Sequence, residues 1–222
     1  MEGDIAPLKN IVKLKEKYGF FLYVDEAHTF GFYGKNGSGL CSELAIAQSV
    51  DFIMTTLSKS TASIGGIVAT SKEFASYLRW STSYIFQASI PPADVAVANA
   101  CLDLMHNQPA IMQSLWEKTY YLRKQLIDLG FDVGESESPI VPVFIRDSDI
   151  LKKMEEELYD QGIFTIAIQY PVVKESEVRF RFIVNNSHTF DDINHPIQTL
   201  YDVGCKYKLI TPYKHKEYQI YA

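Results

Sequence analysis

Short apolar runs alternate with longer amphipathic segments along the first half of the chain. Residues 5–18 carry apolar side chains at roughly helical spacing, which predicts a helix that ends at Gly19. The compact apolar run at 20–24 predicts a strand that is buried on both faces. Two further apolar runs predict strands at 52–56 and 66–70. Strands that alternate with helices in this way are typical of an α/β fold.

The remainder of the chain mixes long helical patterns with short strands. Helical spacing predicts further helices at 72–80, 91–106, 111–129, 148–161 and 189–203. Strand patterns occupy 140–145, 163–168 and 178–184. The change from α/β to α+β character places a domain boundary near 108–135. We therefore divide the chain into residues 1–120, part of a larger α/β domain with a mostly parallel sheet, and residues 121–222, a small α+β domain.

Composition excludes several classes of protein. The chain has 222 residues, of which 47% are hydrophobic and 22% charged, so it can form a sizeable core and is not wholly disordered. A formal net charge of −6 makes it a poor general binder of nucleic acid. No apolar stretch approaches the roughly 20 residues of a transmembrane helix, and no signal segment is visible. Peripheral attachment to a membrane through a surface patch stays open.

The three cysteines are sparse and widely separated. Cys41, Cys101 and Cys205 show no C-x-x-C spacing. Their number and spacing argue against a disulfide framework and against a structural zinc site. We therefore expect a protein of the reducing cytoplasm that holds no metal.

Asp25 and His28 follow the apolar run at 20–24. A carboxylate directly after a buried strand lies at the carboxyl edge of the sheet, where α/β folds bind their ligands. A charged side chain that is buried there needs a positive partner. The alternative is that Asp25 caps the next turn and His28 bonds to the loop.

Lys59 stands shortly after the strand predicted at 52–56, in a segment rich in hydroxyl side chains that ends in Gly65 and Gly66. Small residues let the backbone approach a ligand closely, and a lysine with a lowered pKa can form a Schiff base with an aldehyde or ketone. A phosphate-binding P-loop is a weak interpretation, because the G-x-x-x-x-G-K pattern is absent. The alternative is a surface lysine in a turn rich in serine and threonine.

Arg179 and Arg181 lie two positions apart in the strand predicted at 178–184. The alternation of a strand puts both arginines on one face and Phe180 on the other. Two cations on one face indicate an anion, and the planar fork of a guanidinium suits a carboxylate. The alternative is a solvated face on which the arginines pair with the glutamates of residues 175–177.

Five segments in this order resemble one enzyme family. They are residues 25–28, 56–59, 65–66, 91–92 and 179–181. Together they are similar to the α-oxoamine synthases, which are fold-type I enzymes that depend on pyridoxal 5′-phosphate (PLP). Within this family the segment around Lys59 is most similar to the bacterial serine palmitoyltransferases, and the resemblance covers nearly the whole chain.

The resemblance implies a role for each candidate residue. Lys59 would hold PLP covalently, Asp25 would face the pyridine nitrogen, and His28 would bond to the phenolic oxygen of the ring. Thr56 would contact the phosphate, and Arg181 would receive the carboxylate of the amino-acid substrate. A carboxylate at the pyridine nitrogen keeps that nitrogen protonated, which makes the ring a better electron sink.

The resemblance also implies a homodimer whose site lies at the subunit interface. Ser89 would reach the phosphate of the neighbouring subunit. The chain departs from the family at Gln87, where the family has a hydroxyl side chain. It departs again at 171–178, which lacks the proline- and glycine-rich approach to the arginine strand.

The activity that the resemblance implies is the decarboxylative condensation of an amino acid with an acyl thioester to give an α-oxoamine. Lys59 would remove the α-proton, and the thiol of CoA or of an acyl carrier protein would leave. L-Serine is the first choice of amino acid, as in sphingolipid metabolism. The alternatives are glycine or alanine with another acyl-CoA, an aminotransferase of the same fold, and a catalytically idle interaction fragment.

Members of the family are longer than this chain, and its first residues resemble an internal stretch of the family. We therefore expect a C-terminal fragment that lacks the first strands of the large sheet. A phosphate-contacting turn and the aromatic residue that stacks on the PLP ring would also be missing. A sheet of only three predicted strands would have an exposed edge.

Overall fold

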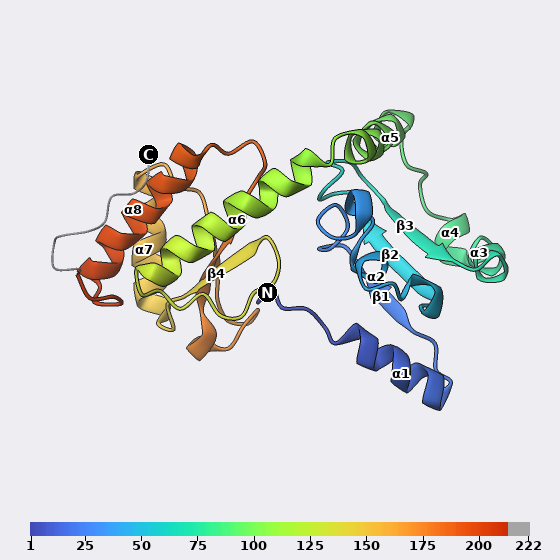
Figure 1. The fold of residues 1–222 in the computed structure, drawn as a ribbon, viewed down its shortest axis with the longest axis horizontal. Coiled ribbons are helices and arrows are strands. Elements are labelled where there is room, and N and C mark those ends of the chain that lie inside the picture. Colours follow the sequence, from blue (N-terminus) through green and yellow to red (C-terminus); the bar gives the residue numbers. More distant parts are fainter. Residues whose placement is uncertain (213–222) are drawn as a thin grey trace. The chain divides into compact units, whose positions relative to one another are not determined.

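The chain folds into two compact units. The computed structural model describes residues 1–212, and Figure 1 shows their helices and strands. The N-terminal unit is Ala6–Met112, and the C-terminal unit joins Met1–Ile5 to the described residues 113–212.

The first residues of the chain belong to the C-terminal unit because they bond to it. Glu2 Oε1 accepts a hydrogen bond from Nη1 of the buried Arg179 at 2.8 Å. The predicted boundary at residue 120 lies inside helix α6 (Ala110–Asp128), whereas the two units divide within the first turn of that helix. The assignment of the two units to a large PLP-binding domain and a small domain stays a prediction.

The N-terminal unit contains a small sheet with helices around it. Its helices are α1 (Leu8–Tyr18), α2 (Leu40–Glu43), α3 (Lys72–Leu78), α4 (Thr82–Ile85) and α5 (Pro92–Asn107). Its strands are β1 (Tyr23–Asp25), β2 (Phe52–Thr56) and β3 (Gly66–Thr70). The hydrophobic pattern does not predict α2 and α4, because helices this short carry no periodic signal.

The strands of this unit form a sheet in the order β1-β2-β3. β1 pairs with β2 in parallel, whereas β3 runs antiparallel to β2. The antiparallel pair follows from the connection, because residues 57–65 join β2 to β3 without a crossover helix. The described part of the sheet is therefore mixed, where the sequence predicted mainly parallel strands.

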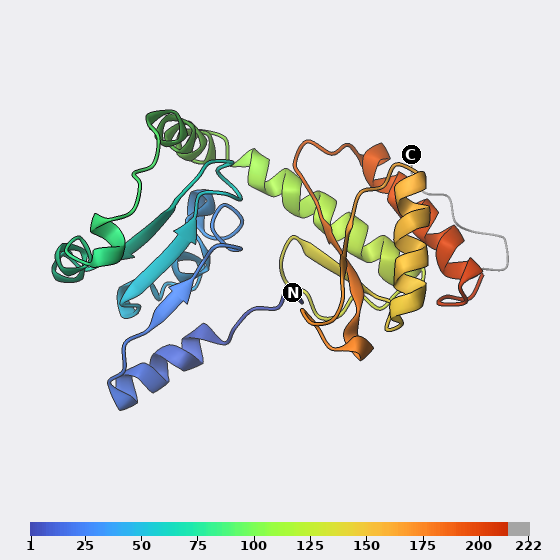
Figure 2. The ribbon, with the colours of Figure 1, turned by 180° about the vertical axis from the view of Figure 1, so that it is seen from behind.

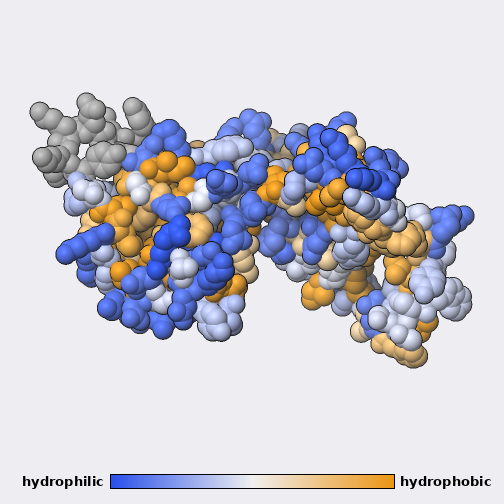
Figure 3. Space-filling model, turned by 90° about the horizontal axis from the view of Figure 1, so that it is seen from below, coloured by the Kyte–Doolittle hydropathy of each residue, from blue (hydrophilic) through white to orange (hydrophobic). Residues whose placement is uncertain are grey.

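β1 is shorter and less buried than the apolar run at 20–24 predicts. Leu22 and Val24 are buried, whereas Phe21 is 71% and Tyr23 54% exposed. The prediction of a strand buried on both faces is therefore wrong, because this unit covers the face of Leu22 and Val24 more fully than the other. Apolar side chains also gather among polar ones on the surface seen in Figure 3.

An ion pair fastens α1 beside the start of β2. Lys15 Nζ lies 2.8 Å from Asp51 Oδ2 and also donates to the carbonyl oxygen of Ser49 at 2.8 Å. The backbone N–H of Leu22 donates to the same Asp51 oxygen at 2.7 Å. The bond from Leu22, and then the bond from Lys15, hold the pKa of Asp51 below its ordinary value.

Replacing Asp51 by asparagine should destabilise the protein near neutral pH by about 1–2 kcal/mol, because hydrogen bonds to a charged group are lost. A carboxyl with a lower pKa in the folded state stabilises the fold above its ordinary pKa of about 3.9, and this contribution is lost as the pH falls through the folded value. Urea unfolding should therefore give a difference between wild type and Asp51→Asn that shrinks in acid. The control is Glu16→Gln, at an exposed position of α1. A difference that does not vary with pH would contradict this account.

The C-terminal unit is an antiparallel sheet with helices on one face (Figure 2). Its strands are β4 (Ile140–Phe144), β5 (Ile166–Ile168) and β6 (Arg179–Ile183), in the order β4-β6-β5. Besides α6, its helices are α7 (Ser148–Asp160) and α8 (Phe190–Lys206). Fully buried side chains from the strands and helices form the core: Val141, Val143, Phe180, Leu126, Leu151 and Leu200.

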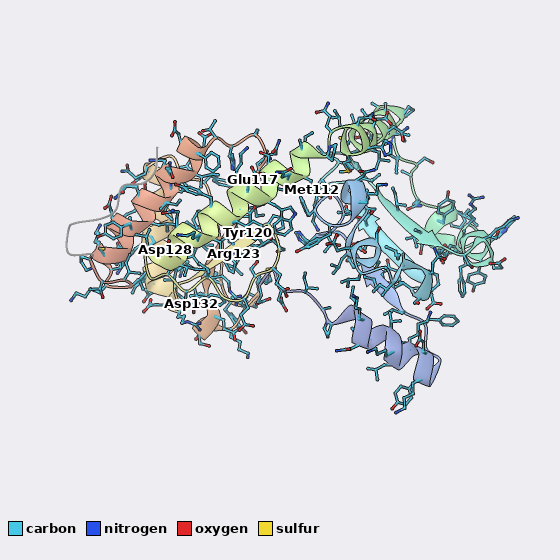
Figure 4. The ribbon with its side chains drawn as sticks, in the orientation of Figure 1. Met112, Glu117, Tyr120, Arg123, Asp128 and Asp132 are labelled. Atoms are coloured by element: carbon cyan, nitrogen blue, oxygen red, sulfur yellow. The ribbon has the colours of Figure 1, made fainter. Side chains whose placement is uncertain are left out.

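Helix α6 packs on this sheet through a buried stripe that includes Leu122 and Leu126. Arg123 reaches from its polar side to the loop before β4 (Figure 4), where Nη2 donates to the carbonyl oxygen of Ser138 at 2.6 Å. This bond ties the helix to the start of the sheet. Neither α6 nor any other helix described within residues 1–212 is long and apolar enough to cross a membrane.

Candidate active site

The ends of β1 and β2 bring two candidate residues to one edge of the sheet. The register pairs Asp25 with Met54, so these side chains lie on the same face. Thr56 follows Met54 by two positions and shares that face. Because the two strands are parallel, Asp25 and Thr56 both stand at the carboxyl edge, where ligands of α/β folds bind.

Asp25 is exposed in the described structure, not buried as the position after an apolar run suggests. Its Oδ1 accepts from the backbone N–H of Ala27 at 2.8 Å. The hydrogen bonding between β1 and β2 continues past Asp25, because the N–H of Glu26 donates to the carbonyl oxygen of Met54 at 2.7 Å. The bond to Ala27 is the turn cap of the alternative interpretation, and it also holds the charged carboxylate at the end of the strand.

His28 lies at an exposed position of the turn that follows. The backbone N–H groups of Thr29 and Phe30 both donate to the carbonyl oxygen of Glu26, at 3.0 and 2.9 Å. Backbone hydrogen bonds therefore hold this turn, which carries the imidazole of His28 three residues past Asp25.

Glu26, to which the sequence pattern assigns no role, is the buried carboxylate of this edge. Its side chain is 2% exposed, Oε2 accepts from the N–H of Leu40 at 2.6 Å, and Oε1 accepts from the N–H of Cys41 at 2.7 Å. Burial, and then a hydrogen bond to Glu26, raises the pKa of the Cys41 thiol to about 12. The signal in the sequence was a charged residue between an apolar strand and a glycine-rich loop, where burial demands several hydrogen bonds.

Lys59 is presented by a loop whose backbone is closed by hydrogen bonds. The N–H of Leu57 donates to the carbonyl oxygen of Gly65 at 2.9 Å, and the N–H of Ser63 donates to that of Leu57 at 2.8 Å. Leu57 and Thr61 are 4% and 0% exposed, whereas Lys59 is exposed. The loop therefore holds an exposed amine between two buried anchors.

Helix α5 braces the same loop. Ser63 Oγ donates to the carbonyl oxygen of Asp94 at 2.7 Å, and Cys101 Sγ donates to that of Thr61 at 3.4 Å. Asp94 and Cys101 lie about two turns apart on one helix, so the loop is held along its length. This support restricts the positions that the Lys59 backbone can occupy.

Hydroxyl groups cluster where β2 ends. Thr56 Oγ1 and Ser58 Oγ lie 2.8 Å apart, and the N–H of Ser58 donates to Thr56 Oγ1 at 3.2 Å. Thr56 Oγ1 also donates to the carbonyl oxygen of Gly65 at 3.4 Å. A hydroxyl can donate to an anionic oxygen as well as accept, so this cluster has the chemistry to hold a phosphate.

Ser89 lies at an exposed position of the segment between α4 and α5. The next residue, Ile90, packs against Gly65, where an added Cβ would lie 2.5 Å from Ile90 Cδ1. Gly65 has a φ of +110°, which L side chains rarely adopt, so glycine permits this close approach. The segment of Ser89 is therefore packed on the loop of Lys59, and the role of Ser89 in a neighbouring subunit stays a prediction.

Arg179 is a structural arginine. It is 1% exposed, Nη1 donates to Glu2 Oε1 at 2.8 Å, and Nε donates to the carbonyl oxygen of Glu177 at 2.7 Å. Phe180 points to the other side of the sheet and is fully buried. Arg179 Nη2 also lies 3.7 Å from Glu177 Oε2, and this ion pair follows the alternative interpretation of the arginine pair, although Arg179 is buried and not solvated.

Arg181 is half-buried at the centre of the C-terminal sheet. Its cross-strand neighbours are Pro142 on β4 and Ile166 on β5. Burial lowers the pKa of Arg181, and a guanidinium keeps its charge at neutral pH in any case. Of the two arginines, it is the one more accessible to a carboxylate from solution. Arg181 belongs to the C-terminal unit, and the other candidates belong to the N-terminal unit: Asp25, His28, Thr56, Lys59 and Ser89.

The fold and the site define a class of protein. Residues 1–200 match the aminotransferase class I and II family, and the chain belongs to that family. The match confirms the predicted fold class.

Particular relatives narrow the class. The chain is 39% identical to a serine palmitoyltransferase of Sphingobacterium spiritivorum, over 90% of this chain and 50% of the relative. It is 35% identical to an 8-amino-7-oxononanoate synthase of Thermosipho melanesiensis, over 95% of this chain and 54% of the relative. A solved serine palmitoyltransferase variant from S. paucimobilis, with bound PLP–myriocin aldimine, matches with a TM-score of 0.89 and 30% identity, over 95% of this chain and 54% of that one.

These relatives are α-oxoamine synthases, so the resemblance to that group is confirmed. The chain spans about half the length of the curated relatives it matches.

Proposed function

We propose that this chain carries active-site residues of an α-oxoamine synthase of the serine palmitoyltransferase type. The reaction is the PLP-dependent condensation of L-serine with an acyl thioester, with loss of CO₂. The observation that carries the proposal is the shared carboxyl edge of β1 and β2, where Asp25 ends one strand and Thr56 ends the other, three residues before Lys59. The identity to serine palmitoyltransferases supports it.

The donor set at this edge fits PLP. The cofactor has a pyridine nitrogen that a carboxylate can keep protonated, an aldehyde that an amine can bind, and a phosphate that hydroxyls can hold. Asp25 offers an exposed carboxylate, Lys59 an exposed amine, and Thr56 a hydroxyl on the face of Asp25. Each of the three groups of the cofactor therefore has a side chain of suitable chemistry: the carboxylate for the nitrogen, the amine for the aldehyde and the hydroxyl for the phosphate.

The chain's residues divide the work of the reaction. When bound, PLP supplies an electron sink for the bonds at the α-carbon of the amino acid. Lys59 holds the cofactor and then accepts the α-proton at Nζ. Asp25 keeps the pyridine nitrogen protonated through its negative charge, and His28 bonds to the phenolic oxygen.

Arg181 orients the substrate. Its guanidinium receives the amino-acid carboxylate with two parallel N–H donors, which fixes direction as well as affinity. Holding the carboxylate in one direction would select which bond to the α-carbon is broken.

We further propose a homodimer in which Ser89 reaches the phosphate bound to the neighbouring subunit. The exposed position of Ser89 and the packing of Ile90 on the Lys59 loop support this arrangement. The acyl donor is a CoA or carrier-protein thioester, and the reaction belongs to sphingolipid metabolism in the cytoplasm. Peripheral contact with a membrane would suit a long acyl substrate.

The purified protein tests the proposal directly. Incubation with PLP, reduction with borohydride and peptide mass mapping should yield a phosphopyridoxyl group on Lys59. CoA release over a matrix of amino acids and acyl-CoAs should be fastest with L-serine and a long acyl chain. A label on another residue would overturn the assignment of Lys59. A preference for glycine or alanine would favour another α-oxoamine synthase, and a labelled protein without CoA release would favour an idle interaction fragment.

Replacing Arg181 by lysine should raise the KM for L-serine about tenfold, because an ammonium loses the planar fork for the carboxylate. The matched control is Arg179→Lys on the same strand, which should lower the thermal midpoint and leave this KM unchanged. CoA release at varied L-serine and thermal unfolding measure the two effects. An equal rise of KM in both variants would remove Arg181 from the substrate site.

A further inference from the structure

Glu26 is a charged side chain buried directly behind Asp25. Its side chain is 2% exposed, and its two oxygens accept backbone hydrogen bonds from Leu40 and Cys41, at 2.6 and 2.7 Å. A buried carboxylate is costly unless its lone pairs are satisfied. The bonds to Leu40 and Cys41 meet that requirement, so removing the charge would disturb the segments that supply them.

The same carboxylate fixes the turn that carries His28. The hydroxyl of Thr29 donates to Glu26 Oε2, and it also lies 3.3 Å from the carbonyl oxygen of Glu26. The backbone N–H groups of Thr29 and Phe30 donate to that carbonyl oxygen too. His28 is therefore held between Glu26 and a residue bonded to Glu26 through both main chain and side chain.

Glu26 also fixes the glycine-rich loop at 31–39. Gly39 packs on the carboxylate, where an added Cβ would lie 2.3 Å from Oε2. The loop closes on itself, because the N–H of Gly31 donates to the carbonyl oxygen of Gly37 at 2.8 Å. Because of this hydrogen bond, a contact that restrains the backbone at Gly39 also restrains the backbone at Gly31.

The other end of this loop touches the segment of Lys59. An added Cβ at Gly31 would lie 2.5 Å from Ser60 Cβ and 3.2 Å from Met105 Cε of α5. Gly31 has a φ of +88°, so glycine allows the backbone to come this close. Ser60 is the residue after Lys59, and it therefore lies against the loop that Glu26 holds.

We propose that Glu26 is a positioning residue for both segments of the PLP site. Glu26 restrains the position of His28 through the turn at 27–30. It restrains the position of the Lys59 backbone through the contact between Gly31 and Ser60. The identity of the ligand rests on the proposed function. Glu26 itself acts through its neighbours and is not a catalytic residue.

Two variants separate this role from a general loss of order. Glu26→Gln keeps the shape, but its amide must turn a donor toward one of the two backbone donors of Leu40 and Cys41. Glu43→Gln is the matched control, because the exposed Glu43 holds the same loop through the N–H of Gly34 at 2.8 Å.

The first readout is amide hydrogen exchange of the protein without PLP. Exchange should rise by about tenfold in Glu26→Gln at 27–31 and also at 57–63, since a hydrogen bond to a charged group is lost. Glu43→Gln should raise exchange only around Gly34. Unchanged exchange at 57–63 in Glu26→Gln would overturn the proposal, whether or not the protein binds PLP.

The second readout is the visible absorbance of PLP bound to the protein. Glu26→Gln should weaken the Kd for PLP about tenfold and shift the pH midpoint of this absorbance, and Glu43→Gln should do neither. A lower thermal midpoint with an unchanged pH midpoint would mean a structural role only and would overturn the proposal.

If Glu26→Gln does not fold, Glu26→Asp, which keeps the charge, undergoes the same measurements with the same outcomes. Wild-type protein that binds no PLP would refute the proposed function, and hydrogen exchange would still decide the role of Glu26.

Discussion

Replacing Lys59 by alanine should abolish the covalent attachment of PLP and slow the condensation by at least about 10²–10⁴-fold. The reason is that, in the proposed function, one amine both holds the cofactor and accepts the α-proton. The side chain of Lys59 is exposed, and the loop is anchored by the buried Leu57 and Thr61, so the fold should survive the change. Borohydride trapping with peptide mapping measures attachment, and CoA release measures the rate.

Two further variants control this experiment. Lys72→Ala removes an exposed lysine from the start of α3 in the same unit and should leave attachment and rate unchanged. Lys59→Arg keeps the positive charge but offers no amine that can bind the aldehyde, so it should behave like Lys59→Ala. A Lys59→Ala protein that still carries the phosphopyridoxyl label, or still turns over at the wild-type rate, would refute the role of Lys59.

Asp25→Asn should lower kcat by about 10²–10³-fold while PLP still attaches to Lys59. Asparagine keeps the oxygen that accepts from the N–H of Ala27 at 2.8 Å, so the turn cap survives and only the charge is removed. Without that charge the pyridine nitrogen loses its proton, and the ring withdraws electrons less strongly. Steady-state CoA release gives kcat and KM, and borohydride trapping reports attachment.

The control for Asp25 is Asp103→Asn, an exposed aspartate on α5, which should retain wild-type kinetics. A normal kcat in Asp25→Asn would mean that another group meets the pyridine nitrogen. A lower thermal midpoint with normal kcat would instead leave Asp25 as the turn cap that its bond to Ala27 makes it. The two roles therefore differ in their kinetic and thermal signatures.

The hydrophobic pattern predicted the elements whose signals are local. The strands at 52–56 and 66–70 have the predicted bounds, and the helix predicted to end at Gly19 does end there, with Gly19 in the left-handed region at φ +70°. The run at 20–24 predicts a strand buried on both faces because all its side chains are apolar. Burial on a second face depends on what covers it, and periodicity holds no information on that.

The candidate site followed the same division. A polar residue at the end of an apolar run lies at the carboxyl edge by a rule of chain direction, which placed Asp25 there from the sequence. The neighbouring Glu26 has the same charge as Asp25, and composition could not show that one carboxylate is buried and the other exposed. That difference arises from Leu40 and Cys41, whose backbone N–H groups meet Glu26 across the glycine-rich loop.

For the arginine pair on β6, too, the sequence predicted one part and the tertiary structure decided the other. Alternation alone put Arg179 and Arg181 on one face, with Phe180 on the other. Only contacts from distant positions, Glu2 to Arg179 and the neighbouring strands to Arg181, decided that the first is structural and the second accessible.

The sequence by itself determined the α/β class, the strands and long helices, and the family to which the candidate motifs belong, because these depend on local period and order along the chain. The tertiary structure decided that β3 runs antiparallel to β2 and that Glu26 is buried. It also decided that Arg179 is a structural residue whereas Arg181 is accessible. Those features depend on pairing, burial and hydrogen bonding between residues far apart in the chain, and their free energy exists only once the chain has folded.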